Sequence, residues 1–186
     1  MPAAPVSAVI LAGGQSSRMG RDKALLPFGG FDTLAEYQFR RLQPLFDEVF
    51  VSLKTDKLPF QALIIYDCAE LSAPIVALTA ILRAVKTPRV FVLAVDTPFF
   101  DAAAIARLLA VDAPVAMART PGGEHPMCAV YDRALLPLFE AALGRNELAL
   151  HRALANEKIV YADFEERLLT NLNHPNEYEA AKCESA

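Results

Sequence analysis

The chain has 186 residues, of which 54% are hydrophobic and 22% charged, and its formal net charge at pH 7 is −4. These values exclude a disordered protein and argue against nonspecific nucleic-acid binding, and the length suits one domain over residues 1–186. The apolar runs are too short to span a membrane and the N-terminus lacks the pattern of a signal peptide, so we expect a cytoplasmic protein.

The first predicted element is a short apolar strand that leads into a glycine-rich, basic loop. Residues 6–11 have the β-branched, apolar character of a strand buried on both faces. Gly13 and Gly14 follow, and then the basic residues Arg18, Arg21 and Lys23. Glycine lets backbone N–H groups approach a phosphate closely, and the cations neutralise its charge. The pattern predicts a nucleotide site, with a simple surface turn as the alternative.

Spacing excludes two common phosphate-binding motifs. A P-loop requires Gly-Lys-Ser/Thr at its end, whereas Gly20 is followed by Arg21 and Asp22. The dinucleotide fingerprint requires Gly-x-Gly-x-x-Gly at the start of a helix, and the segment 13–15 does not supply it.

The rest of the chain alternates between predicted helices and strands. We expect helices over 33–42 (capped by Asp32 or Thr33), 74–85, 101–110, 132–143 and 147–155, and a last helix that begins at Pro175. We expect strands over 49–52, 62–66, 89–95, 114–118, 127–131 and 158–162. This alternation predicts an α/β fold, a three-layer, Rossmann-like sandwich with a mostly parallel sheet.

Four residues that each follow a predicted strand should surround one crevice. Ligands of such sheets bind at the carboxyl ends of the strands, near the point where the strand order reverses. The four residues are Gly13, Ser52, Asp67 and Asp96.

Cysteines and histidines show no pattern of a disulfide framework or a zinc site. They are few and far apart in the sequence, at Cys68, Cys128 and Cys183 and at His125, His151 and His174.

The segment from Leu11 to Leu26 resembles the signature loop of the MobA-like nucleotidyltransferases. The similarity lies in Leu11-Ala12-Gly13-Gly14, Ser17-Arg18-Met19-Gly20, Asp22-Lys23 and Leu25-Leu26. Later segments extend it over nearly the whole chain, and it is greatest to the molybdenum cofactor guanylyltransferase family. Relatives that use CTP usually have Ala at the position of Gly13.

The resemblance implies an enzyme that transfers GMP from GTP to molybdopterin or Mo-molybdopterin, with Mg²⁺ as cofactor and with release of pyrophosphate. The backbone of Leu11, Ala12, Gly13 and Gly14 would hold the nucleotide, and Arg18 and Lys23 would bind the departing pyrophosphate. The implied partners include other molybdenum-cofactor assembly proteins and molybdoenzyme chaperones. We expect a monomer.

Asp96 is the candidate metal ligand. It ends a very apolar strand, where a charge is costly unless a metal ion or a turn hydrogen bond compensates it. The resemblance favours the metal, because Asp-Thr-Pro is where the family has its metal-binding Asp.

On the nucleoside side of the site, one residue matches the family pattern and three differ from it. The family counterpart of Asp67 contacts the nucleotide, although a turn residue is the alternative. Ser52 stands where the family usually has Asn, and it retains one hydrogen-bonding group. Ala73 and Ala77 stand where the family pattern has glycines, and their methyl groups would narrow the wall beside the base.

Three further residues are candidates for binding the acceptor. His125 precedes Pro126 as in the family, with a structural His in a Pro-fixed turn as the alternative. Asn171 and Asn173 lie two residues apart, so in an extended chain their amides share a face. A polar strand end followed by a helix cap is the alternative for this pair.

Other functions stay open at this stage. They are cytidylyl transfer to molybdopterin, nucleotide transfer to a sugar phosphate, and a non-catalytic nucleotide-binding role in cofactor assembly.

Overall fold

A computed structural model describes residues 5–13, 22–55, 57–67 and 73–184 of the chain. In these segments seven strands form one sheet with the order β3-β2-β1-β4-β6-β5-β7. The strands are β1 (Val6–Leu11), β2 (Val49–Leu53), β3 (Leu63–Tyr66), β4 (Arg89–Ala94), β5 (Val115–Thr120), β6 (Gly123–Asp132) and β7 (Ile159–Asp163).

Six α-helices and three 3₁₀ turns connect these strands within the described residues. The helices are α1 (Leu34–Leu42), α2 (Pro74–Ala84), α3 (Ala102–Leu109), α4 (Leu136–Gly144), α5 (Leu150–Ala153) and α6 (Pro175–Glu184). The 3₁₀ turns are η1 (Lys23–Leu25), η2 (Arg133–Leu135) and η3 (Glu166–Leu169). No helix of the described part is both long and apolar enough to cross a membrane.

Side chains of the expected types begin the helices. The hydroxyl of Thr33 accepts a hydrogen bond from Glu36 N at 3.0 Å and caps α1. The carboxylate of Asp101 accepts one from Ala104 N at 2.8 Å and caps α3. Pro74 occupies the first turn of α2, where its missing N–H removes no helical hydrogen bond.

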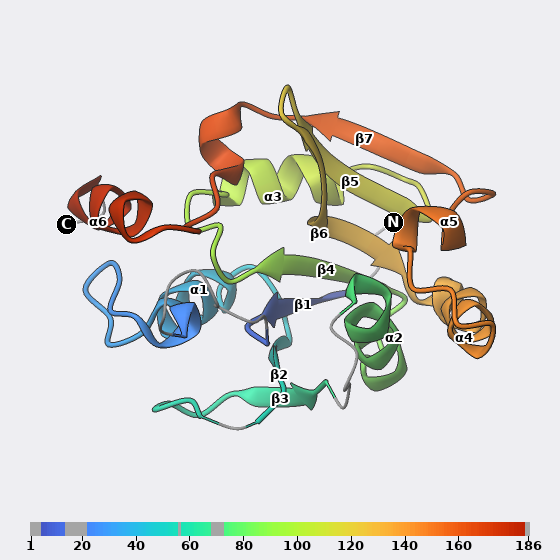
Figure 1. The fold of residues 1–186 in the computed structure, drawn as a ribbon, viewed down its shortest axis with the longest axis horizontal. Helices are drawn as coiled ribbons and strands as arrows, with labels where there is room; N and C mark the ends of the chain where they lie inside the picture. Colours follow the sequence, from blue (N-terminus) through green and yellow to red (C-terminus); the bar gives the residue numbers. More distant parts are fainter. Residues whose placement is uncertain (1–4, 14–21, 56, 68–72, 185–186) are drawn as a thin grey trace.

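Helices cover both faces of the sheet, which confirms the three-layer α/β prediction. Helices α1, α3 and α6 lie on one side and α2, α4 and α5 on the other (Figure 1). Alternate residues of the central strands enter opposite cores. In β4, for example, Phe91 and Leu93 pack with the first group, and Val90 and Val92 with the second. A strand buried on both faces reads as a continuous apolar run, and this is how its sequence reads.

The sheet is mostly parallel, as expected, with one exception at β6. Strands β3, β2, β1 and β4 are parallel to one another, and β5 is parallel to β7. Strand β6 is antiparallel to both β4 and β5. Only Pro121 and Gly122 connect β5 to β6, and so short a connection permits only an antiparallel pair.

Several boundaries differ from the sequence-based expectations. Strand β6 begins at Gly123 rather than Met127, so that Pro126 lies inside a strand instead of fixing a turn. The helix expected over 132–143 is divided into η2 and α4, and the one expected over 147–155 is reduced to α5. Pro137 in the first turn of α4 is consistent with a helix start after η2.

Candidate active site

A cavity of about 430 Å³ lies at the carboxyl ends of strands β1 to β4. Strand β1 pairs with β2 on one side and with β4 on the other, so the chain order reverses between β1 and β4. This is the position at which open α/β sheets bind ligands. The cavity is lined by Leu11, Ala12, Gly13, Asp22, Lys23, Ala24, Ser52, Lys54, Asp67, Ala73, Pro74, Ala77, Ala94, Val95, Asp96, Met127 and Asn173.

Backbone hydrogen bonds beyond the strands hold this edge of the sheet together. Ala12 N donates to Ser52 O at 2.9 Å, and Val95 N donates to Leu11 O at 3.0 Å. Asp67 N donates to Leu53 O at 2.8 Å. The expected grouping of Gly13, Ser52, Asp67 and Asp96 around one crevice is therefore confirmed, while their chemical roles stay predictions.

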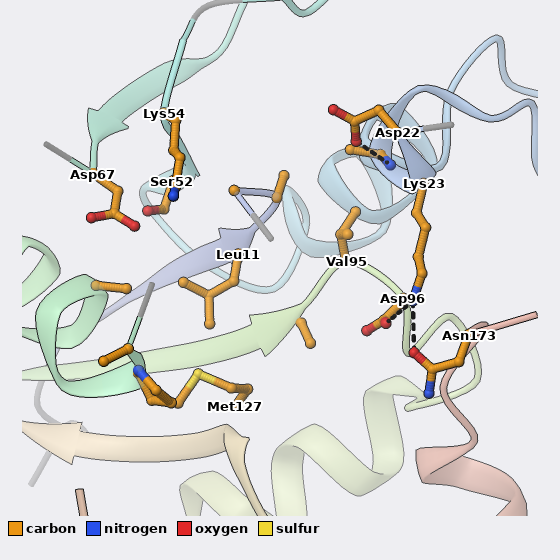
Figure 2. Close-up of a pocket in the computed structure, with 17 residues that line it drawn as sticks. Leu11, Asp22, Lys23, Ser52, Lys54, Asp67, Val95, Asp96, Met127 and Asn173 are labelled. Carbon is orange, nitrogen blue, oxygen red and sulfur yellow. Dashed lines mark hydrogen bonds and ion pairs between the residues drawn. The ribbon is translucent and has the colours of Figure 1, made fainter. Parts of the chain in front are cut away.

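Three segments far apart in the sequence meet at the ammonium group of Lys23. Lys23 Nζ donates to Asp96 Oδ2 at 2.9 Å and to Asn173 Oδ1 at 2.7 Å. The side chains of Lys23 and Asp96 are only 13% and 19% exposed, so water screens their charges less than on the surface. Figure 2 shows these three residues on one side of the cavity, with Ser52, Lys54 and Asp67 on the other.

Local hydrogen bonds fix the backbone that carries Lys23. The carboxylate of Asp22 caps η1 by accepting from Ala24 N at 3.1 Å, and it also forms an ion pair with Lys57. Farther along, the hydroxyl of Tyr178 on α6 donates to Pro27 O. Helix α6 is thereby attached to the segment that follows Lys23.

Glu177 orders the turn that carries Asn173. Its Oε2 accepts hydrogen bonds from Asn173 N at 2.7 Å and from His174 N at 2.8 Å. These bonds, that of His174 above all, lower the pKa of the Glu177 carboxyl. In consequence Asn173 enters the cavity from a backbone that a charged side chain holds in place.

The wall of the cavity opposite Lys23 has the polar side chains of Ser52 and Asp67 and the small apolar ones of Ala73 and Ala77. Ser52 is 2% exposed, and Oδ1 of Asp67 is buried with no hydrogen-bond partner among the described residues. An unsatisfied buried acceptor is costly unless a ligand donates to it. Ala73 and Ala77 both line the cavity, so their methyl groups do border the space predicted for the nucleoside.

Packing against the described residues does not require glycine at position 13. A Cβ built there would lie 3.7 Å from Lys54 N, which is an ordinary van der Waals distance. The lack of a Cβ atom at Gly13 therefore leaves more space in the cavity and does not relieve a clash.

The segment of Asn171 and Asn173 is a turn rather than the extended strand end that we expected. Asn173 N donates to Asn171 O at 3.0 Å, which closes a three-residue turn. Asn173 lines the cavity, whereas Asn171 is not among the residues that line it. The premise that both amides share an extended face is wrong, because this hydrogen bond bends the chain.

His125 lies in β6, outside the set of residues that line the cavity. Its Nε2 is 3.1 Å from the hydroxyl oxygen of Thr120, and burial lowers the pKa of the imidazole. Two other candidates, Gly14 and Arg18, lie outside the described residues.

Comparison with known proteins places the chain in a family. Residues 8–160 match the family model of the MobA-like NTP transferase domain. The chain belongs to the MobA-like NTP transferase family. It is therefore a nucleotidyltransferase, as the resemblance of its first loop implies.

Individual relatives agree with this assignment to the MobA-like family. A molybdenum cofactor guanylyltransferase of Campylobacter jejuni is 34% identical over 185 residues, which cover 96% of this chain and 96% of the relative. The molybdopterin-guanine dinucleotide biosynthesis protein A of Archaeoglobus fulgidus has the same fold, with a TM-score of 0.78 at 19% identity over 97% of this chain and 100% of that chain. A Mycobacterium tuberculosis protein in complex with manganese shares the fold at a TM-score of 0.65 and 16% identity, over 98% of this chain and 100% of that chain.

The oxygens around Lys23 Nζ fit a divalent cation in a MobA-like domain. Among the described residues, no group of three or more His, Cys, Asp or Glu side chains could hold a metal ion. Magnesium in nucleotide enzymes needs no such cluster, because it takes one or two carboxylates and completes its shell with phosphate oxygens and water. Asp96 Oδ2 and Asn173 Oδ1 already face one cation, the Lys23 ammonium.

Several residues in and near the cavity were not singled out from the sequence, among them Lys54, Met127 and Gln38. Lys54 lies just after β2 and Met127 lies in β6, and the rule of strand carboxyl ends could have identified the lysine. Gln38 falls on the buried face of α1 beside Leu34 and Leu42, and a polar residue in an apolar stripe was its signal.

Proposed function

We propose that this chain transfers GMP from GTP to the terminal phosphate of molybdopterin or Mo-molybdopterin and releases pyrophosphate. The product would be molybdopterin guanine dinucleotide. The name of the C. jejuni relative and the loop from Leu11 to Lys23 support this choice of substrates. The observation that carries it is the convergence of Lys23, Asp96 and Asn173 in one cavity.

The reaction needs no nucleophile from the protein. An oxygen of the acceptor phosphate forms a bond to the α-phosphorus of GTP, and the bond from that phosphorus to the bridging oxygen of pyrophosphate breaks. Phosphate monoesters are mostly ionised at neutral pH, so the attacking oxygen already carries the electron pair that it donates. Catalysis then consists of positioning and of neutralising charge.

On the nucleotide side, the backbone of residues 11–14 would hold GTP at the end of β1. Ser52 and Asp67 would hydrogen-bond the nucleoside, and the buried acceptor Oδ1 of Asp67 suits a donor on the ligand. Arg18 and Lys23 would neutralise the departing pyrophosphate.

Asp96 would hold Mg²⁺, and Oδ1 of Asn173 would be its second protein oxygen. When bound, magnesium neutralises charge that builds up on the phosphates. In the structure the Lys23 ammonium donates hydrogen bonds to the same two oxygens. In the nucleotide complex Lys23 would donate to the pyrophosphate instead.

The acceptor would approach from the side of Asn173. Asn171 and His125 remain candidates for binding it more remotely, because neither lines the cavity. We further propose that residues 1–186 act as one domain and as a monomer in the cytoplasm. It would deliver the product to other cofactor-assembly proteins and molybdoenzyme chaperones, without nucleic acid or membrane as a partner.

Isotopic labelling tests which bond breaks. The protein is incubated with molybdopterin and with GTP labelled at either the α- or the γ-phosphorus. The α-label should appear in the pterin product and the γ-label in pyrophosphate. Appearance of the γ-label in the pterin, or of either label in inorganic phosphate alone, would exclude guanylyl transfer.

A further inference from the structure

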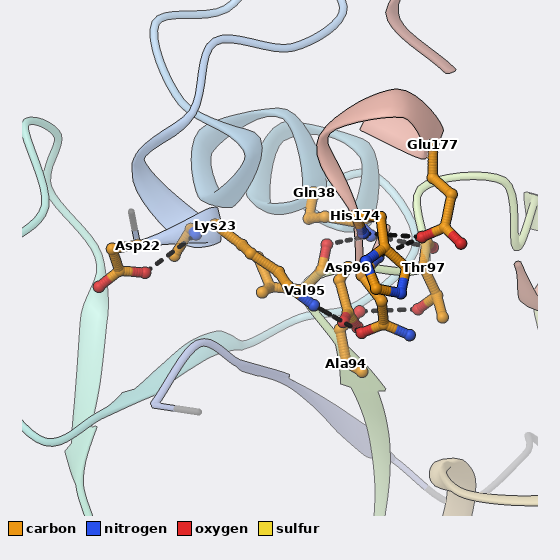
Figure 3. A network of polar contacts seen from close by, with 11 residues as sticks. Asp22, Lys23, Gln38, Ala94, Val95, Asp96, Thr97, His174 and Glu177 are labelled. Carbon is orange, nitrogen blue, oxygen red and sulfur yellow. Dashed lines mark hydrogen bonds and ion pairs between the residues drawn. The ribbon is translucent and has the colours of Figure 1, made fainter. Parts of the chain in front are cut away.

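We propose that Gln38 is a positioning residue that fixes the Asp96 carboxylate for metal binding. The inference rests on the proposed function, because it takes Asp96 as the metal ligand. Gln38 lies on α1, far from Asp96 in the sequence, and it does not line the cavity. Figure 3 shows its side chain directed at the segment that contains Asp96.

The amide group of Gln38 donates to the carbonyls on both sides of Asp96. Its Nε2 lies 3.2 Å from Val95 O and 3.0 Å from Thr97 O. The side chain is 0% exposed, so neither carbonyl can exchange this donor for bulk water. An amide has two N–H donors, and both are used on this short segment.

Arg41, one turn farther along α1, fixes the orientation of that amide. Its Nη1 donates to Gln38 Oε1 at 3.1 Å, and a guanidinium can only donate. The Gln38 atom that faces Arg41 must therefore be the oxygen, and the nitrogen faces the Asp96 segment. The same guanidinium donates to Pro98 O and, at 2.6 Å, to Phe100 O.

Few other contacts could replace these bonds. Within the segment, Thr97 N and Thr97 Oγ1 donate to Ala94 O at 3.2 and 2.7 Å. From the far side, Leu172 N donates to Asp96 O at 2.9 Å. Helix α1 thus holds the carbonyls of residues 95 and 97, and the chain before α6 holds that of residue 96. The Asp96 side chain remains directed at Lys23.

Loss of the Gln38 amide would leave two buried carbonyls unsatisfied, and the segment would shift to recover hydrogen bonds. Residues that orient a metal ligand typically change metal affinity or activity by 10- to 100-fold when they are replaced. A residue that only stabilised the fold would lower the melting temperature and leave the metal affinity of the folded protein unchanged.

The test is a Mn²⁺ titration, followed by electron paramagnetic resonance, of protein saturated with a non-cleavable GTP analogue. Gln38→Met, similar in length but without hydrogen-bonding groups, should weaken Mn²⁺ binding about tenfold. Its affinity for the analogue without metal should change less than twofold. Gln38→Glu should not restore Mn²⁺ binding, because a carboxylate retains the acceptor but lacks the two donors.

Ser7→Ala is the matched control for a buried polar group. Ser7 is also 0% exposed, and its hydroxyl donates to Glu48 Oε2 at 3.0 Å near the start of β1, away from the cavity. This variant should lose stability but retain Mn²⁺ affinity. If Gln38→Met behaves like Ser7→Ala, the inference is wrong. If Gln38→Met does not fold, Arg41→Met decides by the same criterion.

Asp96→Asn separates this inference from the proposed function. If Asp96→Asn weakens Mn²⁺ binding and Gln38→Met does not, only the role of Gln38 is overturned. If Asp96→Asn leaves Mn²⁺ binding intact, Asp96 is not the ligand, and both the metal assignment and the inference fail.

Discussion

The ammonium group of Lys23 is shared by an oxygen of Asp96 and an oxygen of Asn173. A partly buried cation acts more strongly on its neighbours than one in bulk water, because the local dielectric constant is lower. In the proposed reaction this charge would stabilise the pyrophosphate as it departs. Lys23 should therefore matter more for turnover than for folding.

Lys23→Ala should lower kcat by about 10²- to 10³-fold, the usual effect of removing one group that stabilises transition-state charge. Lys158→Ala is the control, because Lys158 is exposed and lies just before β7 at the other end of the sheet. Steady-state pyrophosphate release measures both. Similar turnover in the two variants would remove Lys23 from the phosphate site.

The two asparagines should differ in kinetics because only one of them lines the cavity. Asn173→Ala should raise the KM for molybdopterin and the Mg²⁺ concentration needed for half-maximal activity. Asn171→Ala should raise the KM for molybdopterin alone and leave GTP affinity intact. Purely structural roles predict a loss of about 1 kcal/mol in thermal melts and normal kinetics.

Among single residues, those that directly follow strands could be predicted as site residues from the sequence, because the carboxyl ends of parallel strands meet at one edge of the sheet. It could not indicate that Gln38 supports Asp96, since the contact joins α1 to the end of β4. Nor could it show that Asn171 and Asn173 lie in a tight turn, which depends on local backbone angles.

Helix α6 begins two residues after Asn173, and the carboxylate of Glu177 connects the helix to the backbone of Asn173. Figure 3 shows the Glu177 carboxylate beside His174. Glu177 accepts hydrogen bonds from His174 N and from Asn173 N, and these bonds lower the pKa of its carboxyl. A carboxyl whose pKa is lower in the folded state adds stability above its unfolded pKa. That stability is lost as the pH falls through the folded value.

Glu177→Gln should therefore lower the urea midpoint at pH 7, and its difference from the unmodified protein should shrink below about pH 4.5, the ordinary pKa of glutamate. Glu179→Gln removes the same charge from an exposed position of α6 and controls for net charge. A difference between Glu177→Gln and the unmodified protein that persists or grows in acid would contradict this linkage.

Elements with strong local signals were predicted well. Thr33, Pro74 and Asp101 each stand at the helix start that their chemistry favours. Strands β5 and β6 were both predicted, but the outer part of their hairpin was missed because it is polar, with Glu124 and His125 in β6. A strand that buries no face there leaves no apolar pattern to find.

For the whole molecule, the alternation of helices and strands was sufficient to predict a three-layer fold. It was not sufficient to predict the order of the strands in the sheet. The order β3-β2-β1-β4-β6-β5-β7 depends on which long-range pairs bury most apolar surface, and a single sequence does not display those pairs. The reversal between β1 and β4 nevertheless brings Gly13 and Lys23 to the same cavity as Asp96, which is why the candidate site could be anticipated.

The proposed function depends most directly on which nucleotide base the cavity binds. Because Gly13 has no side chain, the cavity has more space beside Lys54, and the methyl groups of Ala73 and Ala77 reduce the space on the other side. The resemblance of the loop implies guanine, and Ala73 and Ala77 depart from the pattern on which that implication depends. The nucleotide must therefore be tested together with the acceptor.

The decisive measurement is pyrophosphate release with GTP, ATP, CTP and UTP, each with and without molybdopterin. Guanylyl transfer predicts rapid release with GTP and molybdopterin together, and little release when either is replaced or omitted. A preference for CTP or ATP, or release that is independent of molybdopterin, would contradict the proposed function.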